Sequence, residues 1–360
     1  MFFFLFRVCP INKNKVFFVA THDDSEEGNI GIVAATIREK MPDIKTCFLT
    51  KRDGIRHPFS FFITKCYHMA TAGTIFLDNV FMPMAYTPIS SKAKVVQLWH
   101  GTGSIKQFGL DSDSEEVARV ARKGNQRITH LIVNSELTKE QYAGAFAVPK
   151  ERIHILGLPR TDLLLDEGKI IEKQKHFYEQ YGELKNKSCI LYAPTFRDNE
   201  VEKPTISLDL EHLVSVMKPE EVLLLRLHPH VAENFANEKL DKFAGKIINM
   251  SDYSGVTTLL AVSDCLITDY SSIVFEYCLL DRPMVFYAYD YEEFQKEGRD
   301  FYVDYEKFVP GPVVKTQNEL EECWKKGFAD EGKAEAFRRM NYEFLDKNAV
   351  NRLLELIFEK

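Results

Sequence analysis

Short apolar runs rich in β-branched and aromatic residues alternate along the chain with longer segments whose apolar residues recur at helical spacing. Each run is almost continuously apolar, which is typical of strands covered by helices on both faces. The alternation predicts an α/β fold built on parallel sheets. The predicted strands are 15–20, 46–50, 74–78, 94–99, 129–134 and 152–156 in the first half, and 189–194, 222–228, 246–250, 265–268 and 283–288 in the second.

A charged segment of helical period, residues 158–188, separates the two halves, and residues 317–360 are predicted to form helices without a strand. A chain of 360 residues is long enough for two domains of ordinary size. We therefore expect two doubly wound domains facing a central cleft. In such folds ligands bind at the carboxyl ends of the strands, so the residues that follow each predicted strand are the candidates for chemistry.

Composition narrows the function classes. Hydrophobic residues make up 45% and charged residues 28% of the chain, as in ordinary globular proteins. The formal charge of −7 argues against wholesale binding to nucleic acid, and no apolar run approaches the ~20 residues of a membrane span. The opening MFFFLFR lacks the order of a secretory signal, and the seven scattered cysteines form no C-x-x-C pair. A cytosolic, reduced protein is expected.

The first candidate site is WHGTGSIKQFG, residues 99–109, directly after a predicted strand. His100 is expected at the carboxyl end of that strand, where Gly101 and Gly103 let backbone amides approach a ligand. No glycine stands at the sixth position of a G-x-G-x-x-G fingerprint, so a nicotinamide cofactor is not supported. The alternative is a tight turn in which His100 merely caps a helix.

The second candidate is RLHPH, residues 226–230, in which proline fixes the backbone between His228 and His230. The H-x-H spacing also allows a metal site, but no third ligand can be identified, and we favour the reading without metal. The third is TDYSSIVFEY, where Ser271 and Ser272 stand at the start of a helix and could donate to phosphate oxygens. Ordinary helix capping is the alternative there.

The fourth candidate is YAPTFRDN, where Thr195 and Arg197 follow a strand. The arginine fork suits phosphate, whereas an ion pair with Asp198 or another acid is the simpler explanation. Two cleft histidines with hydroxyls and an arginine fit an enzyme that acts on a nucleotide-activated donor. These residues do not decide between attack at phosphorus and attack at a sugar carbon.

Four motifs in series, QLWHGTGSIKQFG, YAPTFRD, LRLHPH and SDCLITDYSSIVFEYCLLDRPMVFYAYD, resemble the CDP-glycerol glycerophosphotransferase family of teichoic acid synthesis. The resemblance runs from about residue 10 to beyond residue 312. It implies two Rossmann-like domains in the GT-B arrangement, with N-terminal domain 1–165, donor-binding domain 166–335 and terminal helices 336–360 packing back across the cleft.

The resemblance also implies a reaction: transfer of glycerol phosphate from CDP-glycerol to a hydroxyl of an undecaprenyl-diphosphate-linked acceptor, with release of CMP and without metal or cofactor. His100 is then the expected general base and His230 the second essential histidine. The enzyme would work at the cytoplasmic, inner-leaflet face of the cell membrane as a peripheral protein. The expected substrate-binding residues are Gly101, Thr102, Thr195, Arg197, Arg226, His228, Thr268, Asp269, Ser271, Ser272 and Glu276.

Several alternatives stay open. A CDP-ribitol donor is excluded by no residue, and a nucleotide-sugar glycosyltransferase of the same architecture would release a nucleoside diphosphate instead. A non-catalytic binding module for a polyol-phosphate polymer, and a metal-dependent phosphoesterase, are weaker readings. Because long extensions of polymerising relatives are missing, a primase or short-chain transferase is expected. The basic stripe Arg119, Arg122, Lys123 and Arg127 could meet anionic lipid, although pairing with Glu115 and Glu116 is the simpler account.

Overall fold

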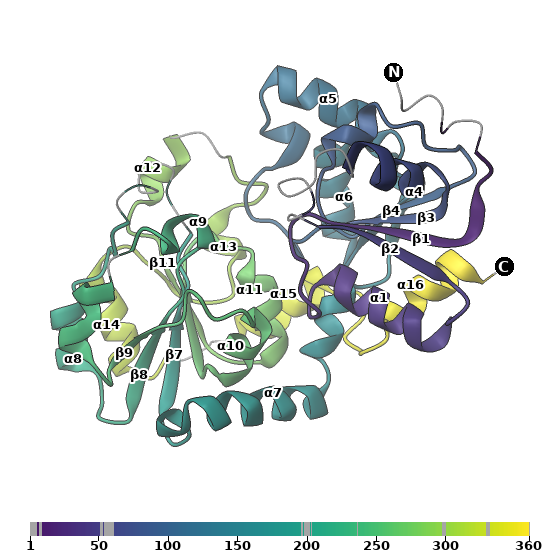
Figure 1. Cartoon of the computed structure of the whole chain (residues 1–360). Coiled ribbons are helices and arrows are strands. Elements are labelled where there is room, and N and C mark those ends of the chain that lie inside the picture. The colour runs from purple at the N-terminus through teal and green to yellow at the C-terminus, as the bar shows by residue number, and fades with distance from the viewer. Residues whose placement is uncertain are drawn as a thin grey trace. The chain divides into compact units, whose positions relative to one another are not determined.

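The computed structural model describes residues 6, 9–50, 53, 61–195, 197, 202, 204–235, 237–296, 300–328 and 332–359. The chain divides into two compact units, each built on its own sheet (Figure 1). Unit 1 comprises Met1–Leu163 and Met340–Lys360, and unit 2 comprises Leu164–Arg339. The two units are described separately below.

Unit 1 contains a six-stranded parallel sheet in the order β2-β1-β3-β4-β5-β6. Its strands are β1 (Asn12–Ala20), β2 (Lys45–Thr50), β3 (Ala72–Leu77), β4 (Lys94–Gln97), β5 (His130–Val133) and β6 (Ile153–Ile155). Its helices include α1 (Asn29–Lys40), α4 (Cys66–Ala70), α5 (Glu115–Asn125), α6 (Glu136–Phe146) and α16 (Ala349–Phe358).

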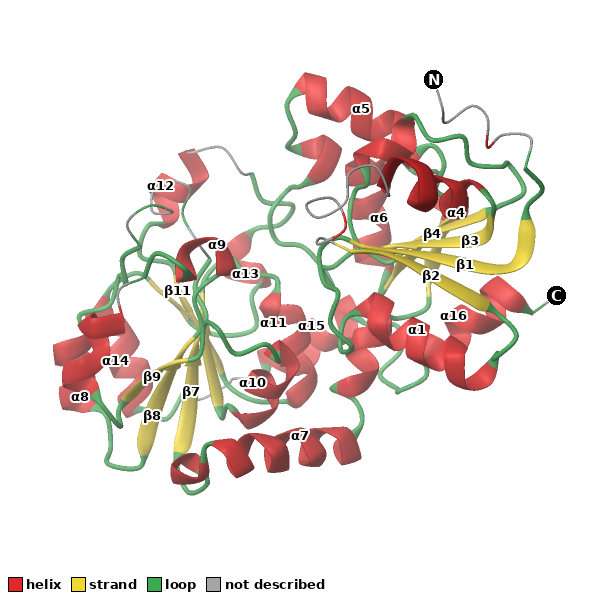
Figure 2. Ribbon diagram, viewed as in Figure 1, coloured by secondary structure: helices red, strands yellow, loops and turns green. Residues whose placement is uncertain are grey.

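Helices cover both faces of this sheet, as the apolar runs require (Figure 2). Along β1 the side chains of Phe17 and Val19 join one core cluster, whereas Val16 and Phe18 join the other. The second cluster also contains buried apolar residues of α1 and of the C-terminal helix α16. The last helix of the chain therefore belongs to the core of unit 1.

Unit 2 contains a second six-stranded parallel sheet, in the order β12-β11-β10-β7-β8-β9. Its strands are β7 (Ser188–Tyr192), β8 (Glu221–Leu225), β9 (Ile247–Asn249), β10 (Cys265–Thr268), β11 (Met284–Tyr287) and β12 (Val313–Val314). Its helices include α7 (Glu167–Gln180), α8 (Leu210–Val216), α9 (Pro229–Ala232), α10 (Val256–Val262), α11 (Ile273–Tyr277), α12 (Tyr291–Lys296), α13 (Tyr305–Phe308) and α14 (Gln317–Lys325), and α15 (Lys333–Asn341) spans the limit between the units.

Both strand orders reverse direction once, and such a reversal opens a crevice at the carboxyl ends of the two strands involved. In unit 1 the reversal lies between β1 and β3, and in unit 2 it lies between β7 and β10. The order of unit 2 is the one found in dinucleotide-binding folds. Functional side chains are therefore expected directly after these four strands.

The predicted α/β class with two Rossmann-like sheets is confirmed, and a strand forms within each of the predicted runs. The sequence missed β12, because two residues are too short to form a recognisable run. All seven cysteines are free, and burial raises the pKa of the Cys66 thiol to about 11 and that of Cys189 to about 12. Within the described ranges, no helix has the length and apolar character needed to cross a bilayer.

Candidate active site

The W-H-G segment leaves β4 through a strained turn. Trp99 has a φ of 57°, a left-handed conformation that is unusual for a bulky residue. Its amide donates to the side-chain oxygen of buried Gln97 at 2.9 Å, and its carbonyl oxygen accepts from Asn29 Nδ2 at 3.0 Å. Arg160 Nη1 donates to the carbonyl oxygen of His100 at 3.0 Å. These bonds fix the direction in which the His100 ring projects.

The imidazole of His100 has a defined tautomer. Its Nδ1 lies 3.2 Å from the carbonyl oxygen of Asp78, the residue that follows β3. Because a carbonyl oxygen can only accept, this bond places a proton on Nδ1 and leaves the lone pair of a neutral ring on Nε2. The geometry thus suits Nε2 of His100 to accept a proton.

The Asp78 carboxylate organises the turn that follows β1. It is 2% exposed and accepts backbone N–H groups from Thr21, His22 and Asp23 at 3.0, 3.1 and 2.9 Å. Burial raises the pKa of Asp78, and these three donors oppose that effect. Asp78 therefore fixes the turn of residues 21–23 through its carboxylate and holds the His100 ring through its carbonyl oxygen.

The carbonyl oxygens of Gly101 and Thr102 accept hydrogen bonds from side chains of unit 1. Tyr142 donates its hydroxyl to the Gly101 carbonyl at 3.0 Å, and Asn134 Nδ2 donates to the Thr102 carbonyl at 2.6 Å. Thr102 is 2% exposed, and its Oγ1 has no hydrogen-bond partner among the described residues. The expected substrate contact through Thr102 stays a prediction, with the side chain buried beneath the loop.

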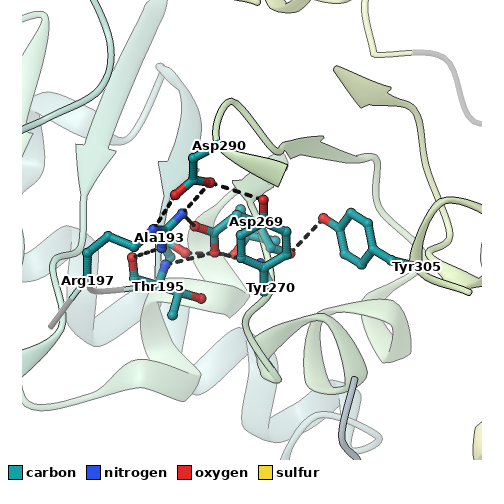
Figure 3. A network of polar contacts seen from close by, with 8 residues as sticks. Ala193, Thr195, Arg197, Asp269, Tyr270, Asp290 and Tyr305 are labelled. Carbon is teal, nitrogen blue, oxygen red and sulfur yellow. Dashed lines mark hydrogen bonds and ion pairs between the residues drawn. The ribbon is translucent and has the colours of Figure 1, made fainter. Parts of the chain in front are cut away.

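In unit 2 the residues after β7 and β10 are joined by a buried charge network (Figure 3). Arg197 is 8% exposed and binds Asp290 through Nε–Oδ2 at 2.6 Å and Nη2–Oδ1 at 2.9 Å. Its Nη2 also donates to Asp269 Oδ2 at 3.0 Å, and its Nη1 donates to the Thr195 carbonyl at 2.6 Å. The guanidinium thus connects the segments that follow β7, β10 and β11.

The electrostatics of this network favour the ionised arginine. Burial alone would lower the pKa of Arg197, but the hydrogen bond with Asp290 and the charge of Asp269 hold it above the usual value. Burial, with Asp290 and Asp269 nearby, raises the pKa of the Tyr270 phenol, which donates to Asp290 Oδ1 at 3.0 Å. Four of the five arginine N–H groups are matched by these acceptors. The expected phosphate contact of Arg197 stays a prediction.

Other predicted residues of the T-D-Y-S-S segment also bond within unit 2. Thr268 donates its hydroxyl to the Ala193 carbonyl at 2.7 Å, and Asp269 Oδ1 accepts the Thr195 amide at 2.8 Å. Ser272 is exposed and Ser271 half-buried at the start of α11, where either hydroxyl can reach a ligand from solvent. Glu276 is 7% exposed on the same helix.

A small pocket lies at the carboxyl ends of β7, β8 and β11. Thr195 and His228 line it together, so the structure brings residues of the second and fourth motifs to one place. The Thr195 Oγ1 is buried and has no partner among the described residues. The full lining is Tyr192, Pro194, Thr195, Pro204, Thr205, Ser207, Leu227, His228, Val231 and Tyr289.

The structure describes the contacts of Arg226 but not the side chain of His230. Arg226 points its Nη1 at the carbonyl oxygens of Met250 and Ser251, at 2.8 and 2.7 Å, and so shapes the turn after β9. Burial lowers its pKa. His230 belongs to α9, but its side chain lies outside the described part of the structure, as does Asp198. Within the described ranges no three His, Cys, Asp or Glu side chains gather as a metal site.

Sequence reasoning missed the residues that position His100 and Arg197. Asp78 ends a predicted strand and could have been suspected for that reason, and Arg160 follows the last strand of unit 1. No sequence pattern indicates the role of Asn29. Its Oδ1 accepts the amide of Arg160 at 3.0 Å, and the two residues are 131 positions apart in the sequence. Such contacts depend on which strand ends are neighbours, and spacing in the sequence does not reveal this.

Comparison with known proteins now decides the family. Residues 1–359 match the model of the CDP-Glycerol:Poly(glycerophosphate) glycerophosphotransferase family. The chain belongs to this family. It is 35% identical to a teichoic acid poly(ribitol-phosphate) polymerase of Bacillus spizizenii over 98% of its own length, but it spans only 57% of that polymerase. It is 31% identical to a teichoic acid ribitol-phosphate primase of the same organism, over 98% of this chain and 93% of the primase.

The chain is also similar to a glycerol-phosphate primase and to two proteins of known structure. The chain is 28% identical to a teichoic acid glycerol-phosphate primase of Bacillus subtilis, over 90% of this chain and 82% of that protein. A variant of the wall teichoic acid polymerase TagF superposes with a TM-score of 0.84 at 23% identity, over 98% of this chain and 91% of the chain in that structure. UDP-GlcNAc 2-epimerase from Neisseria meningitidis gives 0.61 at 14%, over 96% and 100%. These structures support the same two-sheet fold.

Proposed function

We propose that this member of the teichoic acid phosphotransferase family transfers glycerol phosphate from CDP-glycerol to a hydroxyl of an undecaprenyl-diphosphate-linked acceptor. The observation that supports the proposal is the His100 ring, whose Nδ1 bonds to the Asp78 carbonyl oxygen, so that Nε2 is the nitrogen of the neutral ring that can accept a proton. A base set in this way matches the need of a hydroxyl that must lose its proton as it attacks.

In the proposed step the acceptor oxygen forms a bond to the glycerol-bearing phosphorus, and the bond from that phosphorus to the CMP oxygen breaks. The acceptor proton moves to Nε2 of His100, and CMP leaves with the electron pair of the broken bond. Phosphoryl transfer depends mainly on positioning and charge stabilisation, so the proposed step needs a correctly placed base, a fixed donor and groups that stabilise the charge on the departing CMP. General-base help of this kind contributes about 10²–10⁴-fold.

Unit 2 is proposed to hold the donor. Thr195 and His228 line one pocket at the carboxyl ends of the strands, and Ser271 and Ser272 offer hydroxyls at a neighbouring strand end. The Arg197 network holds the segment that carries Thr195, through the Thr195 carbonyl and amide. Positioning of the donor loop is therefore the role that this geometry supports for Arg197 and Asp269. His230 is proposed as a ligand of the diphosphate.

A ribitol phosphate donor is the second candidate. The relative that is 35% identical is a poly(ribitol-phosphate) polymerase, and the relative covered to 93% of its length is a ribitol-phosphate primase. The reaction would be the same, with a longer polyol on the transferred phosphate. The length of the polyol changes the contacts beyond the phosphate and leaves the role of His100 untouched.

The test measures nucleotide release from purified protein with CDP-glycerol, CDP-ribitol and UDP-GlcNAc, each with and without a lipid-linked disaccharide acceptor. We expect acceptor-dependent CMP from CDP-glycerol, and the ratio of rates for the two CDP-polyols assigns the donor. Faster release from CDP-ribitol would move the substrate to the second candidate. Release of UDP from the nucleotide sugar, with no CMP from either polyol donor, would overturn phosphotransfer.

A further inference from the structure

A second histidine lies on the ring of His100. His22 follows β1, and its imidazole stacks on that of His100 with ring centroids 3.7 Å apart and planes inclined by 13°. The Trp99 indole lies 3.9 Å from the His100 ring centroid at 33°. Two rings this close cannot share one face of an imidazole, so His100 lies between His22 and Trp99.

One residue positions both members of the histidine pair. The Asp78 carboxylate accepts the His22 amide at 3.1 Å, and the Asp78 carbonyl oxygen holds Nδ1 of His100 at 3.2 Å. The amides of Thr21 and Asp23 add two further bonds to the same carboxylate. Asp78, at the end of β3, thus bonds both to the backbone of His22 after β1 and to the ring of His100 in the loop after β4.

Stacked imidazoles influence each other's protonation. A neutral ring stabilises a cation above its face, whereas two cations at this separation repel each other. Among the described residues, the charged groups recorded next to the pair include the carboxylate of Asp78, the carboxylate of Asp23, whose charge acts on Asp78, and the guanidinium of Arg160. Histidine is the residue type whose ordinary pKa lies nearest to neutral pH, so we expect the two imidazoles to exchange protons there.

We propose that His22 and His100 form a coupled pair that carries at most one added proton near neutral pH, with His22 a positioning residue that tunes the proton affinity of the base. The inference rests on the proposed role of His100. In the transfer step, the acceptor proton arrives on His100 Nε2 while the neutral ring of His22 stabilises the imidazolium that forms. His22 is exposed and His100 is half-buried. The His22 ring therefore covers one face of the His100 ring and shields that face from water.

Proton NMR titration of the imidazole C–H signals tests the coupling without any substrate. The chain has ten histidines, and the His100 and His22 signals are assigned by their loss in His100→Asn and His22→Phe. In the wild type we expect the His100 titration to be broadened, with a Hill coefficient of about 0.6. In His22→Phe, which keeps a stacked ring without a titrating group, it should become a one-proton curve.

Reciprocity gives a second measurement. Because coupling between two sites is mutual, the His22 titration in His100→Asn should also lose its broadening. The mutual shift is expected to be about one pH unit, even at the dielectric constant of water. Unchanged signals of the remaining histidines show that each variant is folded. One-proton curves with the same midpoints in the wild type and both variants would overturn the coupled pair.

Kinetics separate this inference from the proposed function. If the chain is the proposed transferase, the acidic limb of kcat/KM for acceptor-dependent CMP release should sharpen to a one-proton limb in His22→Phe. An identical acidic limb in wild type and variant would contradict the tuning role. Coupled NMR titrations together with no CMP from either CDP-polyol would leave the histidine pair established and the proposed function wrong.

Discussion

At the scale of single residues, the Arg197 cluster shows how a buried charge is made tolerable. The guanidinium is matched by Asp290 and Asp269 and by the Thr195 carbonyl, and the side chains of the charged partners are between 2% and 13% exposed. An ion pair taken out of water contributes little net stability, yet removal of one partner leaves a buried charge without compensation. The cluster is therefore sensitive to single substitutions.

Asp290→Ala is predicted to destabilise unit 2 strongly. The substitution removes two of the four acceptors of Arg197 and the acceptor of the Tyr270 hydroxyl. We expect the free energy of unfolding, measured by urea denaturation, to fall by about 3 kcal/mol. The double variant Arg197→Met/Asp290→Ala should recover part of that loss. A double variant less stable than Asp290→Ala alone would contradict the assignment of the cost to an uncompensated charge.

The sequence identifies which residues follow strands, but it does not identify their partners. His100, Thr195 and Arg197 could be named from motifs that follow apolar runs. For Arg197 the sequence suggests a phosphate contact or, as the simpler alternative, an ion pair with Asp198 or another acid. Asp198 lies outside the described residues, and the observed partners Asp269 and Asp290 stand 72 and 93 positions away. His22 and Asp78 escaped notice for the same reason, since strand order, and not spacing, makes β1 and β3 neighbours.

At the scale of elements, the parallel strands were predictable because each is buried on both faces and reads as one apolar run. Short elements were not, as β12 shows. The hydrophobic pattern of the sequence also did not indicate which residues attach α16 to unit 1; only the family resemblance implied terminal helices that pack back. Its first two amides, those of Ala349 and Val350, donate at 3.0 Å to the carboxylate of Asp162, which is 8% exposed and lies 187 and 188 positions earlier. A remote carboxylate thus caps the helix.

Asp162→Ala is predicted to lower the free energy of unfolding by about 1–2 kcal/mol, because two amides at the positive end of α16 lose their acceptor. Glu140→Ala, in the same unit, is the control. The Glu140 carboxylate is 57% exposed and pairs with Lys150 at the surface, so its loss should cost less than about 1 kcal/mol. Urea denaturation of both variants measures the difference. Equal effects would contradict the capping role.

The strands β5 and β6 carry a pH-sensitive pair. His130 and His154 stack at 5.1 Å, and burial, with His154 nearby, lowers the pKa of His130 to about 4. A histidine whose pKa is lowered on folding binds fewer protons when folded, so stability is lost as pH falls below about 6.5 toward 4. Between pH 7.5 and 5.0 we expect His130 to account for a loss of about 1 kcal/mol after discounting for solvent screening.

The variant His130→Gln should show a smaller loss of stability over the same pH interval than the wild type. His176→Gln, at an exposed position of α7, serves as the control and should follow the wild type. Urea midpoints at the two pH values give the comparison. A wild-type loss that His130→Gln leaves unchanged would show that other groups cause it.

At the scale of the whole molecule, charge is distributed unevenly over an acidic chain. On α5 the side chains of Arg119, Arg122 and Lys123 are exposed, and none forms an ion pair with Glu115 or Glu116 in the described part of the chain. The Lys123 ammonium lies 4.5 Å from the ring centroid of Tyr86, which is 62% exposed. A basic helix beside an exposed aromatic ring suits an anionic membrane surface, and we propose peripheral binding there.

Sedimentation with vesicles of anionic lipid tests this docking surface. The triple variant Arg119→Glu/Arg122→Glu/Lys123→Glu should lose most of the binding, because each basic residue near such a surface contributes about 1 kcal/mol. The control Lys169→Glu/Lys175→Glu/Lys185→Glu makes the same charge change at exposed positions of unit 2 and should still sediment. Equal binding by both variants would remove α5 as the docking surface.

The most direct test of the account is the rate of acceptor-dependent CMP release in the wild type, His100→Asn and His154→Asn. His154 is a histidine of the same unit on β6, so its loss controls for nonspecific effects of removing an imidazole. We predict that His100→Asn loses activity by about 10²-fold or more with its fold intact, while His154→Asn stays near the wild type. A folded His100→Asn variant with near-wild-type turnover would contradict the role of His100 as the base.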